Sequence, residues 1–333
     1  MLARRLITIP AFLGATALVT LTLPALLLIA LAMRFFGPTR GALATLMFIA
    51  GYLWCETIGI MTSGYIWLRH RERGAFLTAN YRLQCWWANA LKVIAERLFR
   101  LHFEVSGEEA LSGKPALVLP RHASIADTVI PMVFYAIPRK IRLRYVLKNE
   151  LLIDPCLDIV GNRLPNLFVD RGGQDSERAR QGVALLMEGL GPDEGVLIYP
   201  EGTRFSHAKR AALQSRYRES AEMSDQLQRW EILLPPRLGG TMAMLIHNPG
   251  RDLLFCGHSG FEGSSHFSNL INGSWVGARI RIHFWRIPFA ELPRERDAAI
   301  RFLFQQWDRM QDTVRALAAG RPPPLETTGG SRS

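Results

Sequence analysis

Cysteine is scarce in this sequence. The chain has four cysteines, far apart and without a Cys-x-x-Cys pair: Cys55, Cys85, Cys156 and Cys256. Neither a disulfide framework nor a thiolate zinc site is indicated, because both need closely or regularly spaced cysteines. A reducing compartment is the simplest environment for such a chain. We expect no metal and no bound cofactor, since no other cluster of ligands demands one.

A serine-nucleophile motif is also missing. The nearest string to Gly-x-Ser-x-Gly is Gly257–Phe261, which ends in phenylalanine instead of glycine. This disfavours a hydrolase that carries its nucleophile on a strained turn. No internal repeat is visible, and 333 residues are enough for one large domain or two small ones with a full hydrophobic core.

Acidic residues are fewer than basic ones. The chain has 29 Asp and Glu against 40 Lys and Arg, a net charge of +11, and the excess is arginine spread through the polar part. Such a balance favours anionic partners such as phospholipid headgroups, CoA phosphates or nucleic acid. The basic residues form no nucleic-acid-binding motif, so we expect no nucleic-acid partner.

Two long apolar segments occupy the N-terminal part. Leu6–Met33 has no charged residue, and Gly41–Leu68 has only Glu56; each exceeds the roughly 20 residues that cross a bilayer. The first segment is about twice as long as the apolar part of a signal peptide, and the second follows at once. We therefore expect a retained anchor, a membrane helical hairpin over residues 1–73 with its turn at residues 37–41.

The arginines around the hairpin predict its orientation. Five flank its outer ends and two its turn: Arg4, Arg5, Arg69, Arg71 and Arg73 against Arg34 and Arg40. The positive-inside rule then places both ends in the cytoplasm. A hairpin that spans the bilayer and one that enters and leaves from the same face fit this pattern equally well.

Residues 74–319 have the mixed polarity of a soluble α/β domain, in which short apolar runs alternate with helical patterns. The periodicity predicts strands at 116–119, 167–169, 195–199 and 278–287, and helices at 75–101, 176–190 and 294–317. The first helix has an apolar side that either packs on the core or rests on the bilayer, and packing is the commoner outcome. We expect residues 206–231 to form an exposed helical insertion and residues 320–333 a disordered tail.

A histidine and an aspartate follow the first predicted strand. His122 and Asp127 lie five positions apart at a strand-to-helix junction, where the carboxylate can contact the imidazole. Such a contact fixes the tautomer and raises the basicity of the other ring nitrogen, so that it can deprotonate an alcohol. Ser124 and Asp127 also fit a helix capping box, and both interpretations stay open on these residues alone.

Two more polar turns follow predicted strands. Pro200–Arg204 (Pro-Glu-Gly-Thr-Arg) offers a hydroxyl, backbone N–H groups and a guanidinium, which suit a phosphate monoester. A salt bridge between Glu201 and Arg204 at the surface explains the same residues. Phe168–Arg171 ends in an Asp-Arg pair that is as compatible with a structural role as with substrate binding.

Together these segments resemble the glycerolipid acyltransferases typified by the 1-acylglycerol-3-phosphate acyltransferases. The family's histidine, four residues and aspartate match His122 to Asp127, and its later blocks match Phe168–Arg171, Pro200–Arg204 and the proline-bearing stretch Leu233–Gly240. Order and spacing agree for all four blocks, over roughly residues 75–315. Lys148 also stands where the family has a lysine before its second block. One departure is Arg121, where many members have asparagine, which bears on the acceptor pocket.

The resemblance implies a mixed sheet flanked by helices after the hairpin, in a protein of the bacterial inner membrane whose catalytic domain faces the cytoplasm. It implies transfer of a fatty acyl group from acyl-CoA or acyl carrier protein to the sn-2 hydroxyl of 1-acyl-sn-glycerol-3-phosphate, giving phosphatidic acid. His122 would be the general base and Asp127 its partner. The residues expected to bind the acceptor phosphate are Glu201, Gly202, Thr203, Arg204, Arg171 and Lys148. Pro235 and Pro236 are expected to lie on the side of the acyl donor.

Two alternatives remain from the sequence. One is an acyltransferase for another lysophospholipid, as in phospholipid remodelling. The other is a non-catalytic membrane protein that binds anionic lipid through its arginines, against which the intact pair of His122 and Asp127 argues. Oligomeric state is not indicated by any pattern.

Overall fold

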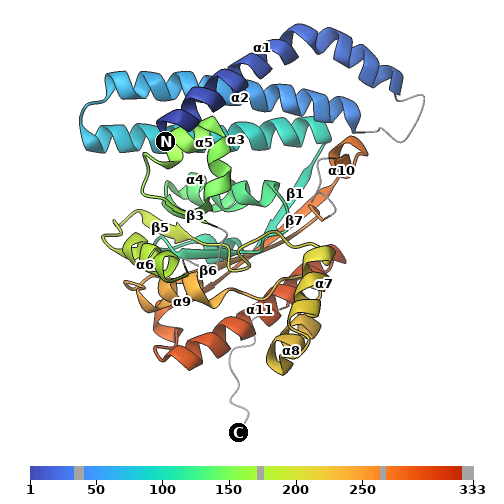
Figure 1. Cartoon of the computed structure of the whole chain (residues 1–333). Helices are drawn as coiled ribbons and strands as arrows, with labels where there is room; N and C mark the ends of the chain where they lie inside the picture. The colour runs from blue at the N-terminus through green and yellow to red at the C-terminus, as the bar shows by residue number, and fades with distance from the viewer. Residues whose placement is uncertain (34–40, 171–175, 263–267, 325–333) are drawn as a thin grey trace.

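The two apolar segments form long helices. In the computed structural model, which describes residues 1–33, 41–170, 176–262 and 268–324, α1 spans Leu2–Met33 and α2 spans Ala42–Arg69 (Figure 1). Both are long and apolar enough to cross a membrane. α2 runs back along α1, as the predicted hairpin requires, although the predicted turn at 37–41 lies outside the described residues except for Gly41.

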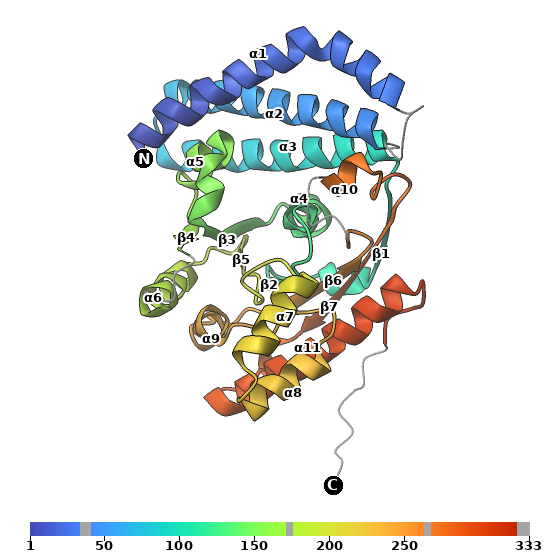
Figure 2. The same ribbon diagram turned by 45° about the vertical axis from the view of Figure 1, so that its right-hand side comes forward.

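Helix α3 (Arg73–Phe99) packs along α2, and the three helices are stacked one above the other (Figure 2). The helix begins at Glu72, whose carboxylate accepts hydrogen bonds from the backbone N–H groups of Gly74 and Ala75. Phe99, at its end, is fully buried, which confirms that this helix packs on the core. Trp86, at the midpoint of the helix, is 39% exposed.

A mixed sheet forms the centre of the domain. Its seven strands, among the described residues, have the order β1-β7-β6-β2-β5-β3-β4, and every neighbouring pair is parallel except β6 and β7. This confirms the predicted mixed sheet flanked by helices. The strands are β1 His102–Ser106, β2 Leu117–Pro120, β3 Arg142–Lys148, β4 Leu167–Val169, β5 Glu194–Leu197, β6 Leu253–Ser259 and β7 Arg279–Ile287.

Each face of the sheet carries its own apolar core. Strand β7 shows the division, since Ile280 and Phe284 lie in the core on the α3 side, while Trp285 lies in the core on the opposite side. Successive side chains of a strand point to opposite faces, which produces this separation. The second core is covered by three helices: α6 (Ser176–Met187), α9 (Leu238–Ile246) and α11 (Arg296–Ala318) (Figure 2).

The predicted insertion at 206–231 is helical but is not wholly exposed. It contains α7 (His207–Arg216) and α8 (Ala221–Arg229). The prediction that the whole segment is exposed is wrong at its C-terminal end. Trp230 is fully buried, and its indole N–H donates to Asp308 of α11 at 2.8 Å. Trp230 therefore packs against the second core, although charged residues dominate the composition of this segment.

Short elements complete the domain: η1 Glu108–Leu111, η2 Ala126–Val129, η3 Met132–Ala136, α4 Ile137–Arg139, η4 Asn149–Ile153, α5 Pro155–Gly161, α10 Ser268–Ile271 and η6 Phe289–Glu291. From residue 325 on, the predicted tail lies outside the described residues.

The hairpin is tied to the domain at several points. Arg4 and Arg5 of α1 both bind the buried carboxylate of Asp158 in α5, at 2.7 and 3.0 Å. At one end of α2, the backbone N–H of Gly41 donates to the carbonyl of Ile271 in α10 at 3.1 Å. Near the other end, Arg163 donates to the carbonyl of Ser63 at 2.8 Å. Helix α2 thus lies along the domain over most of its length.

Candidate active site

The predicted polar turns meet at one edge of the sheet. Strands β2, β5, β3 and β4 are neighbours and all parallel, so their carboxyl ends lie side by side. His122 comes two residues after β2, Glu201 follows β5, and Lys148 is the last residue of β3. Ligands of open α/β sheets bind at this edge, because the loops there converge.

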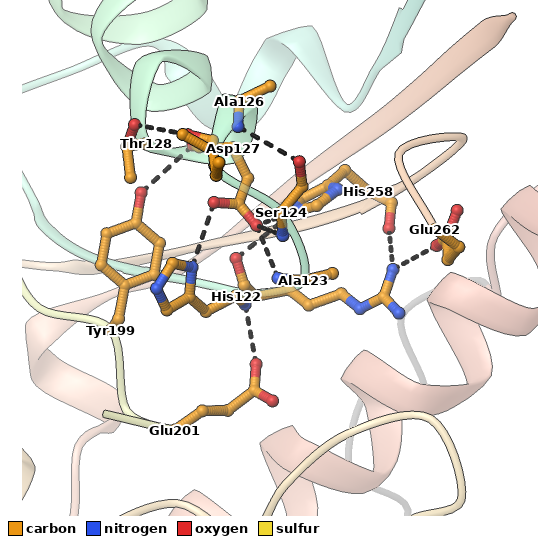
Figure 3. A network of polar contacts seen from close by, with 12 residues as sticks. His122, Ala123, Ser124, Ala126, Asp127, Thr128, Tyr199, Glu201, His258 and Glu262 are labelled. Carbon is orange, nitrogen blue, oxygen red and sulfur yellow. Dashed lines mark hydrogen bonds and ion pairs between the residues drawn. The ribbon is translucent and has the colours of Figure 1, made fainter. Parts of the chain in front are cut away.

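His122 and Asp127 are in contact. Nδ1 of His122 lies 3.1 Å from Oδ1 of Asp127, and both residues are buried (Figure 3). A carboxylate only accepts hydrogen bonds, so Nδ1 carries the proton and Nε2 keeps a lone pair. No hydrogen bond to Nε2 occurs among the residues that the structure describes. The ring of Tyr199 packs against the imidazole with a centroid distance of 4.4 Å.

Asp127 is held by several donors. Its Oδ2 accepts from the backbone N–H groups of Ala123 and Ser124 at 2.5 and 2.7 Å, as in a capped turn. Burial alone would raise the pKa of Asp127, but His122, and then His258, lower it well below the usual range of an aspartate. Asp127 therefore stays ionised, and it contacts the imidazole while it also caps the turn.

Glu201 joins three segments of the site. Its Oε1 accepts from the backbone N–H of His122 at 2.7 Å, and its Oε2 accepts from the backbone N–H of Leu234 at 2.9 Å. Burial raises the pKa of Glu201 to about 8, although these two N–H groups and Arg121 act in the opposite direction. The predicted contact of Glu201 with a phosphate is not what this geometry offers, because both carboxylate oxygens are occupied by backbone donors inside the protein.

The rest of this turn faces a cationic surface. Gly202 has a φ of +62°, and a Cβ at this position would lie 2.8 Å from Nε of Arg237, so only glycine fits without a shift. Thr203 accepts a hydrogen bond from Lys209 at 3.0 Å. Nη1 of Arg204 is a buried donor that has no hydrogen-bond partner among the residues that the structure describes. The predicted salt bridge between Glu201 and Arg204 is absent from the described part of the chain.

The remaining predicted residues differ in how they are placed. Lys148 ends β3 at the same edge, and Arg171 lies outside the described residues. Pro235 and Pro236 follow Leu234, whose N–H is bound by Glu201, so the proline block is fixed next to the site. The backbone N–H of Arg237 donates to the carbonyl of Pro200 at 2.8 Å and connects these prolines to the Pro200–Arg204 turn.

Two residues of the network were not predicted from the sequence. His258 of β6, inside the Gly257–Phe261 string, has Nε2 3.5 Å from Oδ2 of Asp127 and is buried (Figure 3). Glu262 accepts from Arg121 at 2.5 Å. Only the pairing of β6 with β2 brings these residues close to His122 and Asp127, and no local spacing in the sequence indicates this proximity.

The side chain of Arg121 is directed at neighbouring loops inside the domain. Its guanidinium donates to the carbonyls of His258 and Ile232, and its side chain is 1% exposed. The expected effect of this residue on the acceptor pocket stays a prediction, now through the loops that it holds.

No group of three or more potential metal ligands occurs among residues 1–33, 41–170, 176–262 and 268–324.

Comparisons with known proteins find similarity to acyltransferases. The model of a family described as acyltransferase matches residues 102–233. Over 141 residues the chain is 31% identical to a 1-acyl-sn-glycerol-3-phosphate acyltransferase of Pseudomonas aeruginosa, which covers 41% of this chain and 49% of the relative. The chain thus spans about half the length of that relative.

A solved structure shares the fold. The crystal structure of PlsC, the 1-acyl-sn-glycerophosphate acyltransferase of Thermotoga maritima, superposes with a TM-score of 0.53 at 14% sequence identity. The match covers 84% of this chain and 95% of that structure, so it includes more than the matched family segment.

Proposed function

We propose that this protein, whose residues 102–233 match the model of a family described as acyltransferase, moves a fatty acyl group from an acyl thioester to the sn-2 hydroxyl of 1-acyl-sn-glycerol-3-phosphate. The product is phosphatidic acid. The observation that carries the proposal is the buried contact between His122 and Asp127, which leaves Nε2 of the imidazole with a lone pair at the carboxyl edge of the sheet.

The chemistry needs no covalent intermediate on the protein. His122 takes the proton of the acceptor hydroxyl at Nε2 while the oxygen attacks the thioester carbonyl and a C–O bond forms. The tetrahedral intermediate then expels the thiolate as the C–S bond breaks, and the imidazolium returns the proton to sulfur. Asp127 accepts from Nδ1 throughout, which fixes the tautomer and stabilises the imidazolium, and its lowered pKa keeps it ionised.

The turn after β5 positions the acceptor. We assign the acceptor phosphate to Arg204 and Thr203, because Nη1 of Arg204 has no partner among the described residues and a phosphate oxygen can satisfy such a donor. Gly202 permits the turn, and Lys148 and Arg171 are assigned as helpers. Glu201 fixes the turn relative to His122, since its carboxylate bridges the backbone of both blocks. Pro235 and Pro236 are assigned to the side of the acyl donor, acyl-CoA or acyl carrier protein.

The hairpin supports a location at the bacterial inner membrane with the domain in the cytoplasm. Helix α2 contacts the domain from Gly41 to Ser63, which is about 33 Å of helix and close to the ~30 Å hydrocarbon thickness of a bilayer. A helix that crossed the bilayer would place these two contacts at opposite membrane faces. We therefore assign the hairpin as entering and leaving from the same face.

An acceptor panel tests the function. Detergent-solubilised protein is incubated with labelled long-chain acyl-CoA or acyl carrier protein and with lysophospholipids that differ in headgroup, alongside His122→Ala. Diacyl product from 1-acylglycerol-3-phosphate that is lost in the variant supports the reaction and the base together. Product from another lysolipid alone moves the acceptor assignment and keeps the mechanism. Transfer that His122→Ala retains at the parent rate overturns the assigned base.

A further inference from the structure

His258 is a buried histidine that the proposed reaction does not use. It lies in β6, the strand next to β2, and its side chain is 1% exposed. Burying an imidazole costs free energy unless hydrogen bonds satisfy its polar atoms. One ring nitrogen, Nδ1, has no hydrogen-bond partner among the residues that the structure describes. Within that part of the chain, the polar contacts of this side chain are made by Nε2.

Nε2 of His258 lies between two hydrogen-bond acceptors. It is 3.3 Å from the carbonyl oxygen of Arg121 and 3.5 Å from Oδ2 of Asp127 (Figure 3). A carbonyl and an ionised carboxylate only accept hydrogen bonds, so Nε2 carries a hydrogen. Both distances are near the upper limit for a hydrogen bond, as expected when one N–H is shared between two acceptors.

The first acceptor belongs to the peptide unit that carries His122. The carbonyl of this unit is that of Arg121, and its N–H is that of His122, which donates to Oε1 of Glu201 at 2.7 Å. Both polar atoms of the peptide therefore have side-chain partners, one from β6 and one from the turn after β5. Because β2 lies between these two strands, the peptide is held from both sides. Its plane determines the direction in which the side chain of His122 leaves the backbone.

The second acceptor is the carboxylate that orients the imidazole. Oδ1 of Asp127 faces Nδ1 of His122, with which it forms the pair that we call the dyad. Oδ2 accepts from the backbone N–H groups of Ala123 and Ser124, which belong to the same turn as Asp127 and move with it. His258 is a donor from the sheet, so it fixes the carboxylate relative to β6.

Pairing of the two strands does not need this imidazole. The backbone N–H of Arg121 donates to the carbonyl of Cys256 at 3.0 Å, and its guanidinium donates to the carbonyl of His258 at 2.6 Å. Both contacts use main-chain oxygens of β6, so they are compatible with other side chains at position 258. The contacts of Nε2 are therefore additional to those that join β2 to β6.

We propose that His258 is a positioning residue for acyl transfer, because the N–H at its Nε2 holds both the peptide that carries His122 and the carboxylate of Asp127. We assign no substrate contact to His258, which acts through the orientation of the dyad. This role rests on the proposed function, whereas the contact of Nε2 with its two acceptors does not.

Two substitutions separate positioning from packing. His258→Gln keeps an N–H donor near the position of Nε2, whereas His258→Leu fills the site without one. His258→Leu should lower kcat about ten- to a hundredfold, the range of a lost hydrogen bond to a charged group, and leave KM for both substrates near the parent value. His258→Gln should retain most of the parent kcat. Ser259→Ala is the control and should behave like the parent, since Ser259 is the buried neighbour on β6 whose hydroxyl has no partner among the described residues.

The melting temperature of each variant is measured first, and His258→Met replaces His258→Leu if the latter does not fold. A loss confined to kcat that His258→Gln restores supports positioning. Equal losses of kcat in the variants with and without a donor would refute it, as would a loss that appears in KM.

Nitrogen NMR tests the contact without any activity. In detergent-solubilised protein with isotope-labelled histidine, the ring nitrogens report which of them carry hydrogen, and the signals that His258→Gln removes are those of His258. A hydrogen on Nε2 supports the contact, and a hydrogen on Nδ1 alone overturns it, since the imidazole could then donate to neither acceptor. Absence of acyl transfer by the parent would refute the proposed function and leave this result standing.

Discussion

Replacing Asp127 by asparagine changes the dyad at constant shape. Asparagine has one acceptor oxygen and one NH2 group where the carboxylate has two acceptors. In the structure, Oδ2 accepts from two backbone N–H groups, those of Ala123 and Ser124, while Oδ1 accepts from Nδ1 of His122. The amide oxygen therefore turns to the two backbone donors, because the opposite orientation leaves two buried N–H groups unsatisfied at about 1–3 kcal/mol each.

In that orientation the NH2 group faces Nδ1 of His122, which must then accept instead of donate. The proton moves to Nε2, the nitrogen that has to act as the base. We expect the Asp127→Asn variant to lose about 10³- to 10⁴-fold in kcat, or roughly 4–5.5 kcal/mol of transition-state stabilisation, the scale seen when asparagine imposes the wrong tautomer in a serine-protease triad.

The assay is steady-state transfer of labelled acyl groups to lysophospholipid in detergent. Asp225→Asn on α8 is the control, since the carboxylate of Asp225 is 65% exposed and pairs only with Arg229 among the described residues. KM for the acceptor should stay near the parent value, because no acceptor contact is assigned to Asp127. A kcat within tenfold of the parent would refute the tautomer argument.

Three further predictions concern residues that hold the site and the anchor. Folding raises the pKa of Glu201 to about 8, so the folded state keeps this proton to higher pH than the unfolded chain. The free energy of unfolding should therefore fall between about pH 4.5 and 8, by up to 1.36 kcal/mol per pH unit. Urea titrations at several pH values should show a weaker pH dependence for Glu201→Gln, and the same pH dependence in both proteins would contradict this. Gly202→Ala should cost about 1–2 kcal/mol from its positive φ, before any displacement of Arg237, and an unchanged melting temperature would contradict that. Asp158→Asn should release Arg4 and its neighbour, seen by mass spectrometry as faster trypsin cleavage there, whereas unchanged cleavage would exclude the tie.

Local pattern predicts the elements whose environment is one-sided. The alternation in β7 is visible because Ile280 and Phe284 enter one core while Arg279 stays exposed. The strands β2, β4 and β5 and the helices of the hairpin were predicted for a different reason, because each is an apolar run with clear ends. Strand β6 was not predicted, because all seven of its residues are buried and it includes Gly257 and His258, so neither alternation nor composition distinguishes it.

Contacts in the site also divide into those that the sequence predicts and those that it does not. Contacts within one turn, such as His122 with Asp127, follow from spacing, whereas those made between strands depend on the order of the sheet. Glu201 is the clearest case: the sequence favoured an outward role, but pairing of β5 with β2 brings its carboxylate under the backbone of His122. His258 joins Asp127 only because β6 is the other neighbour of β2.

The sequence fits both membrane arrangements of the hairpin equally well. Arginine counts indicate on which side of the membrane the helix ends lie, but not whether the helices cross the bilayer between them. Contacts with the domain favour the proposed arrangement, in which the hairpin enters and leaves from the same face. Helix α3, which packs along α2, carries Arg82, Lys92 and Glu96 in its interior, and charged groups are costly in hydrocarbon. A spanning α2 would draw these charges into the bilayer with it. In the proposed arrangement the hairpin would keep α3 on the aqueous side and leave α1, the outermost helix, in contact with lipid (Figure 2).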